Sequence, residues 1–293
     1  MNTKRLLFKL RLCHGIGIHG EHRVWQWLNH FPEQLITTYL SVQQIIRIAK
    51  IPFRYQSLFQ SDYNSLGLKQ RMQLNNREHW ISILDSNYPL YLKEANFPPN
   101  VLFYRGNINL LKGPLLGVVG ARNHSRYAVN AVYKLLPSVV RRGIAVVAGL
   151  AAGVDSLGHR CAIVNHGSTI AVIGTGLDQY YPRYNYRLQD YIAKHQLLVT
   201  EYPLGTGVRR FHFPSRNRII AGLVHTIVIV EARRRSGSLI TANLALQDNR
   251  NVTAVPGRID QPLSEGCNRL IASGAKPICC SQDILEEFFN LTR

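Results

Sequence analysis

The sequence predicts an α/β protein in which helices cover both faces of a parallel or mixed β-sheet. From residue 115 onward, short apolar runs alternate with stretches whose polar and apolar residues recur at helical spacing. Strands that are apolar along their whole length are typical of parallel sheets buried between two layers of helices. The runs expected to contain strands are residues 115–121, 144–150, 168–174, 196–202, 225–232, 251–257 and 276–280.

The first 80 residues have a different pattern, which predicts a small helical domain. Helices are expected over 23–29, over 42–49 after an N-cap at Ser41, and over 68–79. Residues 12–17 resemble a helix-hairpin-helix turn, for which a structural hairpin is favoured over a phosphate-binding turn. Short strands at 80–85 and 101–104 follow. We therefore expect a helical domain of residues 1–80 and a sheet domain of residues 81–293.

The charge balance predicts an anionic partner. The chain has 35 Lys and Arg against 17 Asp and Glu, a formal net charge of +18. Such an excess indicates nucleic acid or an acidic membrane surface, and nucleic acid is favoured. The five cysteines have irregular spacing and form no C-x-x-C pair, which argues against a disulfide framework and a zinc site. No apolar run approaches the ~20 residues of a membrane span, and Lys9 and Arg11 interrupt the apolar start, so we expect a cytoplasmic protein.

Two turns rich in glycine follow the first two apolar runs. Gly120 lets the first strand turn closely, Arg122 projects at its mouth, and Ser125 begins the next helix. The spacing is not G-x-G-x-x-G, so no dinucleotide fingerprint is present, and a simple turn with a solvated arginine is the alternative. The second turn, with Gly149 and Gly153, can present backbone amides to an anion.

The second turn also carries an acid and a histidine. An aspartate at such a turn favours an N-cap role over a catalytic one, so Asp155 is expected to cap the next helix. His159 lies four residues later and is expected to pair with Asp155. The sequence offers no nucleophile that would complete a catalytic triad with these two residues.

The segment of residues 209–218 contains the densest mixture of cations and aromatic rings. It includes Arg210, Phe213, Arg216, Asn217 and Arg218. Cations hold phosphates, and ring faces accept unstacked bases, where each stacked base contributes about 1–3 kcal/mol. This mixture of cations and rings is therefore typical of single-strand binding. The alternative places the phenylalanines in the core and the arginines in solvent.

Residues 231–242 combine a strand end, three arginines and a Ser-Gly-Ser turn that opens a helix. Ser236, Gly237 and Ser238 can present hydroxyls, amides and the positive end of the helix to phosphate. The segment matches neither a P-loop nor a G-x-S-x-G elbow. Ordinary serine capping with a solvated arginine run is the alternative.

Taken together, these segments resemble the DprA/Smf family of DNA-processing proteins over residues 85 to 275. The longest matching block is FPSRNRIIAGL at 213–223. Other blocks are 88–89, 103–107, 119–122, 153–155, 174–178, 201–203, 236–242 and 254–257. Two features depart from the family: Ala152 stands where a basic residue is frequent, and no C-terminal winged helix is expected.

The resemblance implies an extended Rossmann-like domain, preceded by a SAM- or helix-hairpin-helix-like domain. It further implies sequence-independent binding of single-stranded DNA, homodimers formed through the Rossmann-like domain, protection of incoming strands and loading of RecA in natural transformation. No catalysis, cofactor, metal or membrane is expected. The residues expected to bind DNA are Gly120, Arg122, Ser125, Gly149, Gly153, Arg210, Phe213, Arg216, Asn217, Arg218, Ser236, Gly237 and Ser238.

Two other functions stay open at this point. Nucleotide phosphoribohydrolases share related folds but use a P-G-G-x-G-T motif, which Pro256-Gly257-Arg258 does not match. A binder of duplex DNA or of a membrane surface would use the net charge alone.

Overall fold

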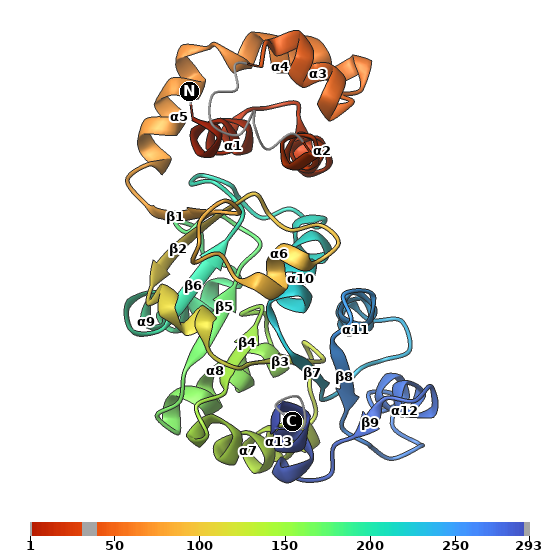
Figure 1. Cartoon of the computed structure of the whole chain (residues 1–293). Coiled ribbons are helices and arrows are strands. Elements are labelled where there is room, and N and C mark those ends of the chain that lie inside the picture. The colour runs from red at the N-terminus through yellow and green to blue at the C-terminus, as the bar shows by residue number, and fades with distance from the viewer. Residues whose placement is uncertain (1, 31–39, 290–293) are drawn as a thin grey trace.

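The computed structural model describes residues 2–30 and 40–289, and its strands form one sheet (Figure 1). The strands are β1 (His79–Ser82), β2 (Val101–Gly106), β3 (Leu115–Val119), β4 (Ala145–Ala148), β5 (Thr169–Val172), β6 (Leu197–Thr200), β7 (Thr226–Ile229), β8 (Asn251–Ala254) and β9 (Lys276–Pro277). Their order across the sheet is β1-β2-β6-β5-β4-β3-β7-β8-β9. The seven strands from β6 to β9 in this order are parallel, and β2 and β1 add an antiparallel edge.

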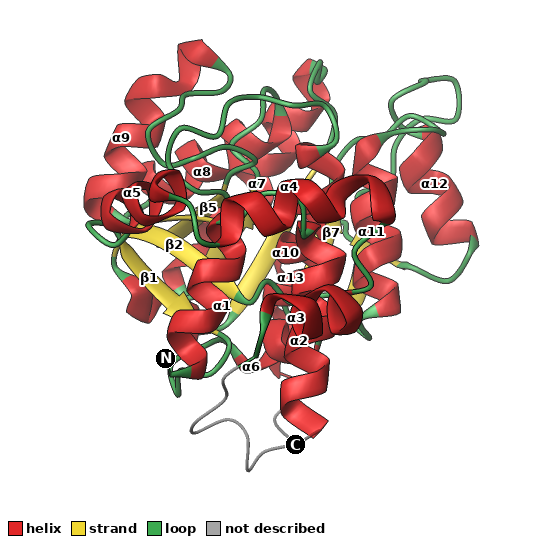
Figure 2. Cartoon of the chain, turned by 90° about the horizontal axis from the view of Figure 1, so that it is seen from above, coloured by secondary structure: helices red, strands yellow, loops and turns green. Residues whose placement is uncertain are grey.

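Helices enclose the sheet (Figure 2). The helices are α1 (Thr3–Leu12), α2 (Gly17–His30), α3 (Val42–Ala49), α4 (Phe53–Tyr63), α5 (Leu66–Asn75), α6 (Leu90–Glu94), α7 (Arg126–Arg141), α8 (Val154–Val164), α9 (Tyr186–His195), α10 (His212–Leu223), α11 (Gly237–Gln247), α12 (Glu265–Ala272) and α13 (Ser281–Phe289). Two 3-10 turns are η2 (Ile108–Lys112) and η3 (Arg183–Asn185). Helix α7 packs on α8 and α13, whereas α10 packs on α6 and α11.

The predicted fold class is confirmed, because each of the seven apolar runs contains one of the strands β3 to β9. Alternate residues along these strands enter two separate cores: Leu116 and Val118 pack with α7, while Leu115 and Val119 belong to the other core. Strands buried on both faces are therefore apolar throughout, as their sequences are.

The amino-terminal helices confirm part of the predicted pattern. Ser41 caps α3 through a capping box with Gln44. The helix expected over 68–79 ends at Asn75, because the chain turns into β1 at His79. Helices α1 and α4 were not predicted.

Helices α1 to α5 form a layer beside β1 and β2 (Figure 1). Phe8 of α1 stacks on Trp80 of β1 with ring centroids 4.4 Å apart, and its ring lies 6.1 Å from Phe103 of β2. These rings belong to a core that continues from α1 into the sheet. The division into domains of residues 1–80 and 81–293 stays a prediction, since the two parts share this core.

A buried ionic cluster joins the same helices to the end of β6. Glu201 is fully buried directly after this strand, and its Oε2 atom lies 3.6 Å from Nη1 of Arg11 and 2.5 Å from Nη2 of Arg218. The other nitrogen of Arg11, Nη2, lies 3.1 Å from Glu21 of α2. The cluster therefore connects α1 and α2 to α10.

The turn between α1 and α2 is a structural hairpin. The amide of His14 donates a 2.8 Å hydrogen bond to Asp62 in the last turn of α4. Gly15 has a φ of +89°, and a Cβ there would lie 3.0 Å from backbone atoms of Tyr55 and Phe59. This packing against α4 uses the amide that a phosphate-binding turn would present. Among the described residues, no helix has both the length and the apolar composition that a membrane span requires.

Candidate nucleic-acid-binding pocket

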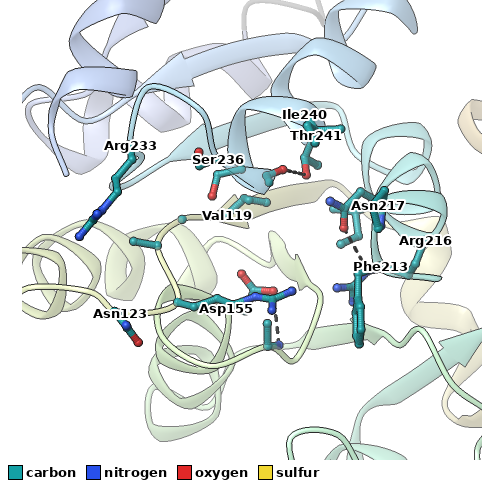
Figure 3. A pocket seen from close by; sticks show the side chains of 18 of the residues that line it. Val119, Asn123, Asp155, Phe213, Arg216, Asn217, Arg233, Ser236, Ile240 and Thr241 are labelled. Carbon is teal, nitrogen blue, oxygen red and sulfur yellow. Dashed lines mark hydrogen bonds between the residues drawn. The ribbon is translucent and has the colours of Figure 1, made fainter. Parts of the chain in front are cut away.

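A cavity of about 860 Å³ lies where β3, β4 and β7 end and α8, α10 and α11 begin. Figure 3 shows Phe213, Arg216 and Asn217 of α10 on one side, with Ser236 and Arg233 across from them. Parallel strands end at the same sheet edge, and the turns that follow them place side chains and helix N-termini around one space. We call this cavity the carboxyl-edge pocket.

Nine of the thirteen predicted residues line this pocket. They are Gly120, Arg122, Arg210, Phe213, Arg216, Asn217, Ser236, Gly237 and Ser238. Their role in DNA binding stays a prediction.

Exposed cations surround the mouth of the pocket. The lining arginines with exposed side chains are Arg122, Arg210, Arg233 and Arg235. Among the described lining residues, Asp155 is the one carboxylate, and it is buried. Its Oδ2 atom accepts hydrogen bonds from the amides of Gly149 at 3.0 Å and Ala151 at 3.4 Å. The mouth is therefore strongly positive.

Arg216 forms the floor of the pocket instead of its rim. Its side chain is buried, and Nη1 donates to the carbonyl of Gly149 at 2.6 Å and to that of Val172. Burial lowers the pKa of Arg216 to about 10, although the nearby Asp155 favours its charged form. The guanidinium thus ties α10 to the ends of β4 and β5.

Gly149 and Gly153 support the pocket from behind. A Cβ on Gly149 would lie 2.3 Å from the guanidinium of Arg216, so this position has room only for glycine while Arg216 keeps its bonds. Gly153 has a φ of +78°, and a Cβ there would lie 2.2 Å from the carbonyl oxygen of Ala121. This close approach brings the start of α8 against the loop after β3.

Phe213 is the aromatic centre of the pocket. Its side chain is half-buried, the guanidinium of Arg122 lies 5.4 Å from its ring centroid, and the ring of Tyr181 lies 5.0 Å away at 40°. A cation over an aromatic face is attracted by the ring electrons, which holds Arg122 near Phe213. Two rings and a cation therefore meet in one place.

The start of α11 provides an open anion site. Ser236 occupies the N-cap position but makes no capping hydrogen bond, and its buried Oγ has no partner among the described residues. Ser236 and Gly237 both line the pocket. The first amides of an eleven-residue helix carry a partial positive charge, which favours phosphate. Ordinary serine capping is excluded for this turn.

Ser125 and Arg218 lie outside the pocket lining and bind acids elsewhere in the fold. The hydroxyl of Ser125 donates to Glu231 at 2.5 Å, and its backbone amide donates to the same carboxylate at 2.9 Å. Arg218 points to Glu201 on the other side of α10. Gly149 and Gly153 also lie outside the lining, as supporting residues.

Two predictions about the second turn were wrong. Gly153, not Asp155, is the N-cap of α8, because Asp155 lies within the first turn and accepts amides from the preceding loop. His159 contacts Thr169 Oγ1 at 2.7 Å instead of Asp155. Complete burial lowers the pKa of His159 to about 3, so this histidine is neutral in the core.

Sequence reasoning did not assign Asn123, Tyr181, Arg233 or Arg235 to the site. Arg233 and Arg235 belong to the run of three arginines that directly follows β7. Because residues after a parallel strand lie at the carboxyl edge of the sheet, this position could have assigned both arginines to the site. Tyr181 lies in the long connection after β5 and is one of four tyrosines between residues 180 and 186, so the pattern did not single it out.

The fold and the pocket define an extended Rossmann-like protein with a basic, aromatic-lined cavity at the carboxyl edge of its sheet. The sequence model of the family described as DNA recombination-mediator protein A matches residues 79–289, and the chain belongs to this family. The resemblance to DprA/Smf proteins is confirmed.

Known relatives agree with this assignment. The DNA processing protein DprA of Streptococcus pneumoniae is 48% identical over 207 residues, covering 71% of this chain and 73% of the relative. DprA of Bacillus subtilis is 44% identical over 208 residues, covering 71% and 70%.

Two solved structures extend the comparison. The X-ray structure of S. pneumoniae DprA has a TM-score of 0.87 at 37% identity and covers 98% of both chains. The structure of DNA processing protein A from Helicobacter pylori, described for its single-stranded-DNA binding mode, has a TM-score of 0.65 at 26% identity. It covers 74% of this chain and 98% of its own.

The floor position of Arg216 predicts a stability effect that a rim arginine would not have. Arg216→Ala removes hydrogen bonds to two strand-end carbonyls and the attraction of this guanidinium for the buried Asp155, so we expect the free energy of unfolding to fall by about 3 kcal/mol. Arg122→Ala, at the exposed mouth, should change it by no more than about 0.5 kcal/mol. Urea denaturation of both variants measures the difference, and equal losses would contradict the floor assignment.

Proposed function

We propose that this protein binds single-stranded DNA in the carboxyl-edge pocket without reading the base sequence. The observation that carries the proposal is the meeting of four exposed arginines with the paired rings of Phe213 and Tyr181. Cations of this kind hold successive phosphates, and aromatic faces accept bases of any sequence. The single-stranded-DNA binding described for the H. pylori relative supports the same ligand.

The proposed contacts divide into phosphate and base positions. Arg122, Arg210 and the start of α11 at Ser236–Ser238 would hold phosphates, while Phe213 would stack a base. Asn217 projects beside Phe213 and can hydrogen-bond a base edge (Figure 3). Arg233 and Arg235 supply positive charge to the pocket, whereas Ala152, at a position where the family often has a basic residue, supplies none.

We also propose that the protein performs no chemistry on the strand. The one carboxylate among the described lining residues, Asp155, already accepts two backbone amides, and burial raises its pKa against the influence of Arg216. A general base must reach the proton that it removes, and Asp155 is buried with its Oδ2 atom bound to amides of its own loop. In this proposal Asp155 instead shapes the turn that carries Gly149 and Ala151.

Removing Arg210 tests the phosphate contacts. We expect Arg210→Ala to lower the affinity for single-stranded oligo-dT and to reduce the magnitude of its log–log salt slope by about 0.7, the value for one phosphate contact. Fluorescence anisotropy titrations across a salt series measure both quantities. Lys112→Ala, which removes an exposed cation at the end of η2, is the charge-matched control and should leave the slope unchanged.

The same titrations with duplex DNA and anionic vesicles decide between ligand classes. Duplex or vesicle binding that equals single-strand binding, together with an unaltered slope in Arg210→Ala, would contradict the proposed function.

Replacing the stacking ring tests the base contact. Phe213→Leu keeps the apolar bulk but removes the aromatic face, so the affinity for single strands should fall about five- to one-hundredfold, equivalent to about 1–3 kcal/mol. The salt slope should not change, because no phosphate contact is lost. A melting curve provides the control: a large drop in melting temperature with normal binding by the folded protein would make Phe213 a packing residue instead.

We further propose that the protein acts in natural transformation as a homodimer that protects incoming strands and loads RecA onto them. The family assignment supports this role. A dimer holds one strand at two pockets, and the second contact is then intramolecular and gains from a high effective concentration. Such a gain would let pockets of modest affinity compete with a protein that coats the strand.

The partner proposal predicts stimulation of RecA-mediated strand exchange on DNA coated with a single-strand-binding protein. The stimulation should fall in Arg210→Ala in proportion to its loss of affinity, and light scattering at micromolar concentration should give the mass of a dimer. A strict monomer that leaves strand exchange on coated DNA unchanged would contradict it.

A further inference from the structure

A second basic groove lies on the amino-terminal helices, apart from the carboxyl-edge pocket. Two adjoining cavities of about 600 and 300 Å³ share Arg5, Lys69 and Met72 as lining residues. We call this space the α1–α5 groove and define it by Lys4, Arg5, Lys9, Lys69, Met72 and Trp80. Its walls are α1 and α5, and its floor reaches β1.

The groove collects positive charge, although one of its cations, Lys4, is paired with Asp85 at 2.8 Å. Among the described lining residues there is no carboxylate. Arg5 and Lys69 are exposed and form no ion pair with a described residue, whereas the nearest acids are already paired: Asp85 with Lys4 and Asp62 with Arg71. Burial and, to a smaller extent, repulsion by Lys69 lower the pKa of Lys9. A bound anion would relieve this repulsion.

Aromatic rings alternate with these cations. Lys4 Nζ lies 4.8 Å from the ring centroid of Trp80, which is half-buried, and Lys9 Nζ lies 3.4 Å from that of Tyr63. The side-chain amides of Gln73 and Asn76 also line the larger cavity. Tyr63 is buried and Trp80 stacks on Phe8 with one face, so Trp80 is the partly exposed ring that a base can meet. Cations, one such ring and amides in a concave groove suit phosphates, a stacked base and base edges. A lipid surface would instead favour an exposed apolar ridge beside the cations.

We propose that the α1–α5 groove is a second binding site for single-stranded DNA. This inference rests on the proposed function, because the DNA in the groove is a further segment of the strand that the carboxyl-edge pocket holds. The groove reaches the sheet at β1, and the pocket lies at the end of β3. Five strand spacings of ~4.8 Å separate these two strands, which gives a distance on the order of 24 Å. Only a strand long enough to span this separation would reach both.

Strand length separates the two sites experimentally. We would compare an oligo-dT of about 6 nucleotides, within the range that one binding module covers, with one of about 30 nucleotides. The double substitution Arg5→Ala and Lys69→Ala removes two exposed cations from the groove. It should weaken binding of the longer strand about tenfold at 0.15 M salt and reduce its slope magnitude by about 1.4, with the shorter strand unaffected.

Matched variants distinguish the groove from the pocket and from net charge. The control Lys112→Ala with Lys194→Ala removes the same charge from exposed positions outside the groove and should leave both strands unaffected. Arg210→Ala should weaken both lengths. Normal binding of the longer strand by the groove variant, while Arg210→Ala remains weak, would overturn the groove and leave the pocket intact. If Arg210→Ala also bound normally, the proposed function would fail as well.

Photocrosslinking gives a readout independent of affinity. A long strand carrying 5-iododeoxyuridine should crosslink to peptides that contain Trp80, the partly exposed ring of the groove, as identified by mass spectrometry of the full-length protein. These crosslinks should be lost in the groove variant and kept in the charge-matched control. Crosslinks confined to peptides of the carboxyl-edge pocket, or a groove variant that loses binding to anionic vesicles but not to DNA, would overturn the proposal.

Discussion

The buried Arg216 and the partly buried Arg218 fix α10, the helix from which the carboxyl-edge pocket is built. Arg216 donates to carbonyls at the ends of β4 and β5, and Arg218 pairs with the fully buried Glu201 after β6. A buried charge is costly unless it is paired or hydrogen-bonded, so neither side chain can move away without leaving a polar group unsatisfied. Since α10 begins at His212, these anchors determine where Phe213 and Asn217 project.

The same cluster couples the pocket helix to the amino-terminal helices. Glu201 also meets Arg11 of α1, which in turn meets Glu21 of α2. Burial raises the pKa of Glu21 to about 7 despite the attraction of Arg11. Hydrogen bonds between buried charged groups depend on distance and angle, whereas an apolar contact tolerates sliding. The α1–α5 groove and the carboxyl-edge pocket are therefore held in one orientation by charge as well as by the contact of Phe8 with Trp80.

The sequence predicted the sheet because each central strand is buried on both faces and apolar throughout, so that the signal is local. The site was predicted less completely, because its geometry depends on partners distant in sequence. Ser125 resembled a pocket residue, but its hydroxyl is taken by Glu231, 106 positions away. Arg216 and Arg218 stand two residues apart in one basic run, and only the packing of α10 decides that one reaches the pocket floor and the other reaches Glu201. Helix α1 was missed because its lysines and arginines interrupt the apolar pattern.

This division of the arginines explains why net charge alone does not locate a binding site. Some of the 35 lysines and arginines act inside the fold, where Arg11, Arg216 and Arg218 are structural cations. The exposed cations at the mouth of the pocket and along the α1–α5 groove differ from these, because they line cavities whose described lining holds no exposed carboxylate. In both places the cations stand beside aromatic rings, and this pairing, more than the charge itself, favours a strand with unstacked bases over a duplex, whose bases are already stacked on one another.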